Sequence, residues 1–230
     1  MSTKKRIMLV DDEVDLREAL TDQFAIYDEF DVVGIENGAD AIKQAKAEEF
    51  DLIILDVGLP DFDGREVCRM LRKSDIKVPI IMLTGASTDA DTILGLDSGA
   101  NDYVTKPFNF SILMARVRAH LRMYEQSEDA VLTVGPYRFR PAQKILEFDD
   151  KSKIRLTEKE ANILKYLYRA EEKSVTREEL LNDVWGYNAG VTTHTLETHI
   201  YRLRQKIEVK NSAKRIIITE QGGYRLNRHY

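Results

Sequence analysis

The sequence predicts an α/β domain with a parallel, doubly wound sheet, followed by a smaller domain of helices and short strands. Five apolar runs alternate with amphipathic helical segments up to about residue 123, a polar stretch then occupies 124–130, and the charge balance changes sign after it. A length of 230 residues with 43% hydrophobic and 32% charged residues suits two ordinary globular domains. The expected boundaries are therefore a first domain at 1–123, a linker at 124–130 and a second domain at 131–230.

The first domain is predicted to consist of five strand–helix units. An apolar run bounded by turn residues indicates a strand buried on both faces, and apolar residues at three- and four-residue spacing indicate a helix. The strands are expected at 7–10, 31–35, 52–55, 78–83 and 102–105, and the helices around 16–24, 39–47, 67–71, 93–96 and 113–121. This alternation predicts a parallel sheet with helices on both faces.

Polar residues directly follow four of these strands. They are Asp11 and Asp12 after the first strand, Asp56 after the third, Thr84 after the fourth and Lys106 after the fifth. In a doubly wound sheet the carboxyl ends of the strands meet at one edge, where such folds place their chemistry. The sequence therefore predicts a single pocket that contains three carboxylates, a hydroxyl and an amine.

This predicted pocket needs positive charge. Two carboxylates about 5 Å apart repel each other by roughly 3 kcal/mol at an effective dielectric constant of about 20, so three would be protonated or would attract a cation. Oxygen ligands in an open, hydrated site suit Mg²⁺. We expect Asp56 to accept a phosphoryl group, with Mg²⁺ and Lys106 stabilising the transferring oxygens. Two simpler alternatives are that Asp56 is a turn or N-cap residue and that the Mg²⁺ site is only structural.

The second half of the chain predicts three helices and a terminal hairpin. Short strands are expected within 132–139 and 144–148. Capping boxes at Thr157 and Thr176 open two helices, and a third helix is expected at 193–207. A glycine-containing turn at 220–223 joins two further strands. Three helices followed by a hairpin is the layout of a winged helix-turn-helix.

The third helix is predicted to bind DNA. Its apolar stripe consists of Leu196, Ile200, Leu203 and Ile207. The opposite face carries groups able to reach base edges and phosphates, namely His194, Thr198, Tyr201, Arg202 and Gln205, flanked by Arg204 and Lys206. Residues 130–230 hold 19 lysines and arginines against 13 acidic residues, whereas residues 1–124 hold 15 against 23, which favours a polyanionic partner for the second domain. A solvated polar face is the alternative.

Composition argues against several other classes of protein. Cys68 is the only cysteine of the sequence, so neither an internal disulfide nor a cysteine metal cluster is expected. No apolar run approaches the roughly 18 residues that would cross a bilayer, and the first residues lack a signal-peptide pattern. We therefore expect a cytoplasmic protein with no membrane partner.

Four motifs occur together in the first domain: Leu9-Val10-Asp11-Asp12-Glu13, Asp56 with Pro60 and Gly64, Thr84, and Lys106-Pro107-Phe108. In this combination, residues 5–123 resemble the receiver domain of bacterial two-component response regulators. The resemblance implies a flavodoxin-like sheet of order 2-1-3-4-5 and transfer of a phosphoryl group to Asp56 from a sensor histidine kinase. It also implies Mg²⁺ held by Asp12, Asp56 and the Gly58 carbonyl with Asp11 acting through water, a cis Lys106–Pro107 bond, and a switch pair formed by Thr84 and Tyr103.

The second domain carries its own set of motifs: Leu180-Leu181…Val184-Trp185-Gly186, Thr195-Leu196…His199-Ile200…Arg202-Leu203-Arg204, and Gly223-Tyr224-Arg225. They resemble the winged-helix effector domain of the OmpR/PhoB class of response regulators. The resemblance implies that phosphorylation promotes a homodimer, which binds repeated half-sites of double-stranded DNA. It also adds Arg225 to the expected DNA-binding residues and makes 186–192 a candidate surface for RNA polymerase.

The chain departs from the family pattern on its DNA-binding and dimer faces. Gln221 lies in a shortened wing turn, and His194 and Tyr201 stand where arginine is frequent, so base preference does not transfer from relatives. Exposed ion pairs contribute only about 0–1 kcal/mol each, so the strength of the dimer stays open. On the expected dimer face, Asp97 and Arg118 match an ion pair of the family. Asp102 is also present, but its usual partner position is occupied by Met123, with Arg122 next to it. Thr92 and Ile112 stand where the family has another charged pair.

Two other functions remain open on the sequence. A regulator of this fold could bind DNA without phosphorylation, although the complete set of pocket residues argues against it. An aspartyl-phosphate hydrolase would also use a strand-end aspartate with Mg²⁺, but such an enzyme is expected to carry a second aspartate where this chain has Gly58. We therefore expect a transcription regulator whose only chemistry is its own phosphorylation and dephosphorylation at Asp56.

Overall fold

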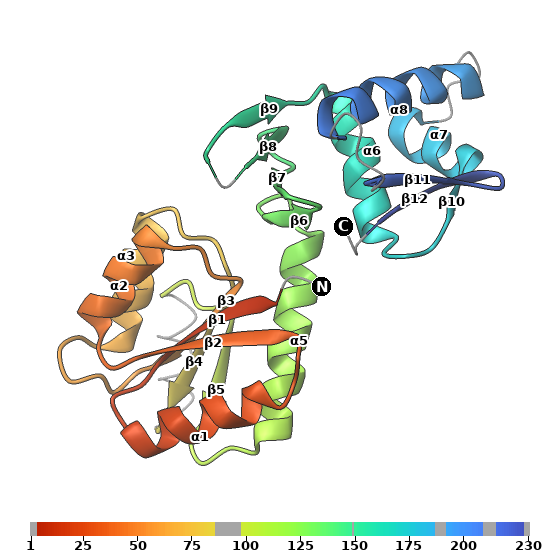
Figure 1. Ribbon diagram of the computed structural model, residues 1–230. Coiled ribbons are helices and arrows are strands. Elements are labelled where there is room, and N and C mark those ends of the chain that lie inside the picture. The colour runs from red at the N-terminus through yellow and green to blue at the C-terminus, as the bar shows by residue number, and fades with distance from the viewer. Residues whose placement is uncertain (1–3, 86–97, 149, 187–191, 209–214, 228–230) are drawn as a thin grey trace. The chain divides into compact units, whose positions relative to one another are not determined.

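Figure 1 shows the computed structural model of the chain, which describes residues 4–85, 98–148, 150–186, 192–208 and 215–227. The chain divides into two compact units that meet between Glu125 and Gln126. Helix α5 (Phe110–Gln126) ends at this point, so the first three residues of the expected 124–130 linker are helical. Each unit has its own sheets and helices.

The first unit contains a five-stranded parallel sheet with the order β2-β1-β3-β4-β5, which confirms the predicted flavodoxin-like topology. Its strands are β1 (Lys5–Val10), β2 (Phe30–Ile35), β3 (Leu52–Asp56), β4 (Ile80–Thr84) and β5 (Asp102–Thr105). The helices described with it are α1 (Val14–Ala25), α2 (Gly38–Ala47), α3 (Gly64–Lys73) and α5. The helix expected around 93–96 lies outside the described residues.

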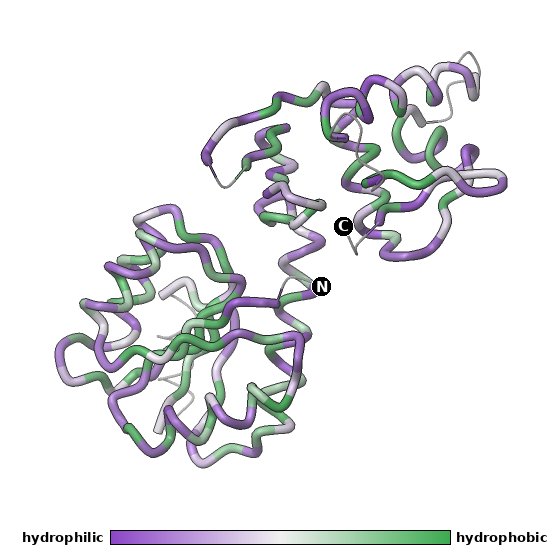
Figure 2. The backbone as a smooth tube through the Cα atoms, viewed as in Figure 1, coloured by the Kyte–Doolittle hydropathy of each residue, from purple (hydrophilic) through white to green (hydrophobic). Residues whose placement is uncertain are grey.

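The hydrophobic core of this unit lies on both faces of the sheet. Successive strand residues point to opposite faces, so Ile7 and Leu9 pack with α1 and α5, whereas Met8 and Val10 pack with α2 and α3. The central strands accordingly contain the densest hydrophobic stretches of the unit (Figure 2). All five residues of β3 are buried. This two-sided burial explains why an unbroken apolar run leads to Asp56.

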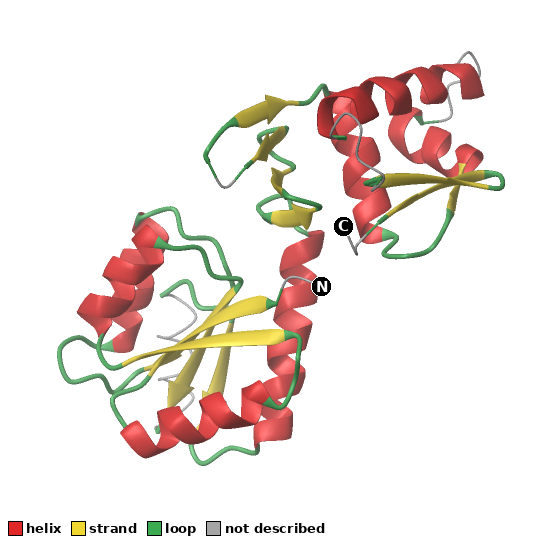
Figure 3. Cartoon of the chain, viewed as in Figure 1, coloured by secondary structure: helices red, strands yellow, loops and turns green. Residues whose placement is uncertain are grey.

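The second unit begins with a four-stranded antiparallel sheet in the order β6-β7-β8-β9 (Figure 3). These strands are β6 (Leu132–Val134), β7 (Tyr137–Arg140), β8 (Ile145–Glu147) and β9 (Lys153–Arg155). The run predicted at 132–139 contains the first two strands, and Gly135 in the turn between them has a φ of 56°. A positive φ of this kind favours glycine, which explains where the run is interrupted.

Three helices and a second sheet complete this unit. The helices are α6 (Glu158–Arg169), α7 (Arg177–Trp185) and α8 (Thr193–Ile207), and both predicted capping boxes are present at the starts of α6 and α7. Strands β10 (Val175–Thr176), β11 (Ile217–Glu220) and β12 (Gly223–Leu226) form a sheet of order β10-β12-β11, which confirms the winged-helix layout. Among the helices described, none is long and apolar enough to cross a membrane.

Candidate functional site

Three of the predicted pocket residues are in direct contact at the carboxyl edge of the parallel sheet. Asp11 follows β1, Asp56 ends β3 and Lys106 follows β5. The Nζ atom of Lys106 lies 2.8 Å from Asp11 Oδ2 and 2.6 Å from Asp56 Oδ1. The second oxygen of Asp56, Oδ2, accepts a hydrogen bond from the Gly58 N–H at 2.6 Å. The sheet order thus joins residues that are 95 positions apart in the sequence.

Burial and charge oppose each other in this pocket. Asp11 and Asp56 are both buried. Burial raises the pKa of Asp56 against the opposing effect of the Lys106 ammonium, and the nearby charge of Asp11 raises it further. Burial alone would lower the pKa of Lys106, but its bonds to both carboxylates raise that pKa above its usual value. The ionised form of Asp56 therefore depends on Lys106 and would be favoured by a further cation.

The other predicted residues, Asp12, Thr84 and Tyr103, lie on or just after strands of the same sheet. Asp12 is exposed, directly after Asp11. Thr84 ends β4 and is buried, whereas Tyr103 on β5 is half-buried, with its hydroxyl 3.4 Å from Ser98 Oγ. The Lys106–Pro107 bond is cis, as the resemblance implies. In the parts of the chain that the structure describes, no three or more His, Cys, Asp or Glu side chains are grouped so that they could hold a metal ion.

Asp61 and Gly64 shape the loop that follows Asp56. The Asp61 carboxylate accepts hydrogen bonds from the N–H groups of Gly38 and Ala39 at 2.9 and 2.8 Å, which ties this loop to the start of α2. A Cβ atom on Gly64 would lie 2.0 Å from the Asp56 carbonyl oxygen, so only glycine fits there. Gly64 was part of the receiver motif. Asp61 carried no sequence signal of its own, because its partners are 22 and 23 residues away.

Asp102, one of the expected dimer-face residues, makes contacts within its own unit. Asp102 accepts hydrogen bonds from Arg116 Nη1 at 2.7 Å and is bonded to His120 Nε2 at 3.0 Å, rather than to Arg122, which is exposed. Arg116 and His120 were not predicted, although their four-residue spacing places both on one face of α5. A sequence search for basic residues at this spacing opposite β5 would have found them.

The remaining dimer-face predictions have different outcomes. Arg118 pairs with Glu29 and lies over the Tyr27 ring, 5.2 Å from its centroid. Ile112 is exposed, as is Met123. Asp97 and Thr92 lie outside the described residues, so the structure does not describe the expected Asp97–Arg118 pair.

The predicted outward face of α8 is present. His194, Tyr201, Arg202 and Gln205 are exposed, and Thr198 is half-buried. Gln205 Nε2 donates a hydrogen bond to the Tyr201 hydroxyl at 2.7 Å. The apolar stripe predicted on the opposite side is completely buried. The spacing of the helix therefore predicted correctly which residues point inward and which point outward.

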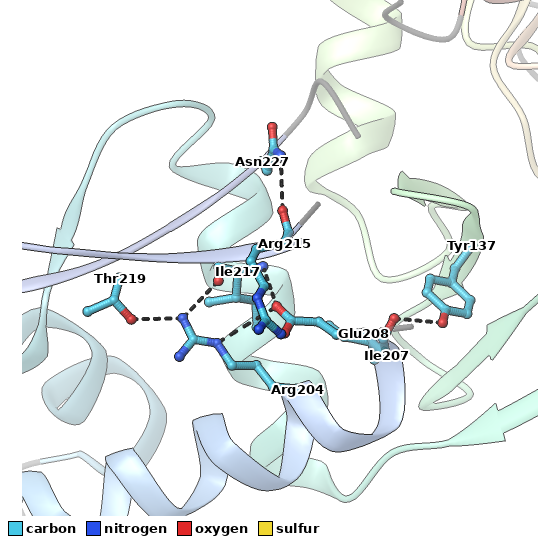
Figure 4. A network of polar contacts seen from close by, with 8 residues as sticks. All are labelled: Tyr137, Arg204, Ile207, Glu208, Arg215, Ile217, Thr219 and Asn227. Carbon is cyan, nitrogen blue, oxygen red and sulfur yellow. Dashed lines mark hydrogen bonds and ion pairs between the residues drawn. The ribbon is translucent and has the colours of Figure 1, made fainter. Parts of the chain in front are cut away.

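Two of the arginines predicted to bind DNA make contacts within their own chain. Arg204 Nη2 donates hydrogen bonds to the Ile217 carbonyl and to Thr219 Oγ1, both at 2.8 Å (Figure 4). Arg225 pairs with Glu220 across the β11–β12 hairpin. The Arg204 contacts were invisible in the sequence, because they depend on how the hairpin packs on α8.

The same network fixes the C-terminal end of α8. Glu208 pairs with Arg215 at 2.7 Å, and the Tyr137 hydroxyl donates a hydrogen bond to the Ile207 carbonyl at 2.7 Å (Figure 4). Helix α8 is therefore held both by the hairpin and by β7. This support sets the orientation of its outward face.

Comparisons with known proteins agree with the two-unit architecture. Residues 7–118 match the family described as response regulator receiver domain, and residues 151–226 match the family described as transcriptional regulatory protein, C terminal. The DNA-binding response regulator MtrA of Mycolicibacterium smegmatis is 39% identical over 225 residues, and the alkaline phosphatase synthesis transcriptional regulatory protein PhoP of Bacillus subtilis is 38% identical over 235 residues; both alignments cover 96% of each chain. The receiver domain structure of a Francisella response regulator matches with a TM-score of 0.50 and 28% identity, over 52% of this chain and 98% of that one.

A carboxylate–lysine pocket on a parallel sheet, joined to a winged-helix unit, defines a DNA-binding response regulator. The two family matches and the relatives aligned over nearly the whole chain establish that this class applies here. The chain belongs to the OmpR/PhoB family of response regulators and is a transcriptional regulator that binds DNA under the control of phosphorylation.

Proposed function

We propose that Asp56 is the residue that is phosphorylated and that the donor is the phosphohistidine of a sensor histidine kinase. The transfer breaks the P–N bond of the donor and forms a P–O bond to an Asp56 carboxylate oxygen. The observation that carries this proposal is the contact between Asp56 Oδ1 and Lys106 Nζ at 2.6 Å. An ammonium group in this position stabilises negative charge on the transferring oxygens.

Lys106, Thr84 and Tyr103 have distinct proposed roles. Lys106 is bonded to Asp11 as well as to Asp56, so it is held in place before any phosphoryl group arrives. Thr84 ends the strand next to β3 and is proposed to bind the phosphoryl oxygens through its hydroxyl. Tyr103 is proposed to turn inward in response, which would change the β5 surface.

The oxygen donors of the pocket fit Mg²⁺. We propose that Asp12, Asp56 and the Gly58 carbonyl hold the ion and that Asp11 acts through water. Mg²⁺ retains several waters and is commonly bound by one or two carboxylates, so a cluster of three protein carboxylates is unnecessary. Asp12 is exposed and can therefore reach a hydrated ion. When bound, Mg²⁺ supplies positive charge beside the transferring oxygens.

The output of this switch is proposed to be a homodimer on DNA. Two linked winged helices bind two half-sites more tightly than one, because the second contact occurs at high effective concentration. The proposed contacts to double-stranded DNA come from the outward face of α8, with Arg202 reaching a phosphate. RNA polymerase is proposed to contact 186–192, of which 187–191 lie outside the described residues. No turnover of an external substrate is proposed, only phosphorylation and autodephosphorylation at Asp56.

The phosphorylation site is tested by labelling the full chain with a radioactive acyl phosphate in the presence of Mg²⁺. The wild-type chain is expected to incorporate phosphate, and Asp56→Asn is expected to abolish incorporation. Asp63→Asn is a matched control, because Asp63 lies in the same loop but caps α3 and pairs with Arg65 outside the pocket. Persistent labelling of the Asp56 variant would overturn the assignment.

A further inference from the structure

The outward face of α8 contains a continuous stripe of polar and aromatic side chains with no lysine or arginine among them. His194, Thr198, Tyr201 and Gln205 are spaced by four, three and four residues, which places them in one row along a helix. Tyr201 is 62% exposed, the largest exposed aromatic surface among the residues described. We call these four residues the reading stripe.

Hydrogen bonds within the reading stripe orient its side chains. Gln205 Nε2 donates to the Tyr201 hydroxyl at 2.7 Å, which holds the phenol ring along the helix. The Gln205 amide keeps its oxygen acceptor and its second N–H for another partner. Thr198 Oγ1 donates a hydrogen bond to the His194 carbonyl at 2.9 Å, so its hydroxyl proton is used within the helix. The methyl group is therefore the part of Thr198 that remains for an apolar contact.

The cationic side chains of α8 lie outside this stripe. Arg204 is held by the Ile217 carbonyl and Thr219, and Lys206 pairs with Glu160 at 2.6 Å. Among the described residues of α8, Arg202 is the one lysine or arginine that makes no hydrogen bond or ion pair within its own unit, and it lies beside the stripe. Guanine is usually recognised by a bidentate arginine or lysine. The reading stripe offers no such group.

We propose that the reading stripe recognises A·T base pairs in the major groove. This inference rests on the proposed use of α8 as the DNA-reading element. The Tyr201 ring and the Thr198 methyl group pack against the C5-methyl groups of thymine, which only thymine presents in that groove. The Gln205 amide pairs with N6 and N7 of adenine, a pairing for which it retains one acceptor and one donor.

The test begins with selection of bound fragments from random DNA by the full chain, treated with acetyl phosphate and Mg²⁺. Each selected half-site is expected to contain A·T pairs at its centre. The selected duplex is then made with uracil in place of those thymines, which removes the methyl groups and leaves the base pairing intact. Wild-type protein is expected to bind about fourfold more weakly for each contacted methyl group removed, the factor that burial of one such group implies.

Three variants separate the reading stripe from general DNA affinity. Tyr201→Ala is expected to discriminate between thymine and uracil duplexes about fourfold less than the wild-type protein, because only the Thr198 contact remains. Tyr201→Phe keeps the ring and therefore the full discrimination. Arg202→Ala is the matched control, because it is expected to weaken binding to both duplexes by the same factor. Tyr201 and Arg202 are exposed, so these substitutions remove no core contacts.

Several outcomes would overturn the inference while leaving DNA binding intact. They are G·C pairs at the centre of the selected half-sites, equal wild-type binding to thymine and uracil duplexes, or discrimination in Tyr201→Ala that is as strong as in the wild-type protein. Failure to enrich any sequence would instead contradict the use of α8 as the reading element, and this inference with it.

Discussion

Arg202 and Arg204 are two residues apart on α8, yet their surroundings differ completely. Helical periodicity places Arg202 on the outward face and Arg204 on its flank, but it does not reveal what either side chain contacts. In the structure Arg204 bonds to the Ile217 carbonyl and to Thr219 of the hairpin, whereas Arg202 is exposed. At the scale of single residues, the periodicity of one element predicts direction, but a side chain's partner also depends on the neighbouring element.

This contrast gives a prediction for two alanine variants. Arg204→Ala is expected to lower the free energy of unfolding of the second unit by about 1 kcal/mol, because hydrogen bonds between α8 and β11 are lost. Arg202→Ala is expected to leave unfolding unchanged and to reduce the salt dependence of DNA binding by about one unit of slope, as for loss of one phosphate contact. Urea unfolding and fluorescence anisotropy over a salt series measure the two effects. The opposite pattern would show that the roles of the two arginines are reversed.

At the scale of elements, the strands and their polar ends could be predicted because both follow from local pattern. An apolar run four residues long marks β3, and the residue after it is Asp56. The connection between the loop after β3 and the start of α2 could not be predicted, since Asp61 contacts Gly38 and Ala39 across more than twenty residues of chain. Long-range capping of this kind has no periodicity that a sequence would show.

The Asp61 contact predicts a pH-dependent contribution to stability. Burial of the carboxylate raises the pKa of Asp61, but the hydrogen bonds from the Gly38 and Ala39 N–H groups outweigh this effect and hold the pKa below its usual value. A carboxyl group with a lowered folded-state pKa stabilises the fold above its unfolded pKa of about 3.9 and loses that effect as the pH falls through the folded pKa. Asp61→Ala is therefore expected to cost about 1 kcal/mol at pH 7, and less as the pH falls below about 4.

Asn37→Ala provides the control for this prediction. Asn37 caps the same helix by accepting a hydrogen bond from the Asp40 N–H at 2.9 Å, and its amide does not titrate. Its loss is expected to lower stability to an extent that varies little between pH 7 and about pH 2, a range that extends well below the unfolded carboxyl pKa of about 3.9. Urea unfolding of both variants across this range measures the difference. A penalty for Asp61→Ala that stays constant over the range would show that its carboxylate is not the stabilising group.

At the scale of the whole molecule, the two-unit organisation followed from the change in pattern and charge along the sequence, but the dimer face did not. Asp102 and Arg118 were expected to form ion pairs with a second copy of the chain. Within one copy of the chain, Asp102 is bonded to Arg116 and His120, and Arg118 pairs with Glu29. A sequence places charges on a face but does not reveal whether they are already paired within one subunit. Among the described residues of α5, Ile112 and Met123 are exposed apolar side chains, and we propose that they contribute to the dimer contact.

This leads to a prediction about assembly. The full chain, treated with acetyl phosphate and Mg²⁺, is expected to elute as a dimer at micromolar concentration, and raising the salt concentration is expected to leave the dimer intact. Ionic contacts between exposed groups are screened by salt, whereas apolar contacts are not. Size-exclusion chromatography with light scattering, run at low and high salt, measures the mass directly.

Two variants identify the surface that carries the contact. The first variant is Ile112→Ser. Ile112 is 54% exposed on α5, so this substitution removes apolar area from the proposed contact and is expected to shift the phosphorylated protein toward monomer. Val14→Ser is the matched control, because Val14 is 50% exposed at the start of α1, whereas the residues that contact Arg118, Tyr27 and Glu29, lie beyond the other end of that helix. Dimers that dissociate in high salt would show that ion pairs carry the contact despite their partners within each subunit. A wild-type chain that is phosphorylated at Asp56 yet strictly monomeric would show that the change at 92 and 112 has removed the dimer, so that each half-site is bound independently.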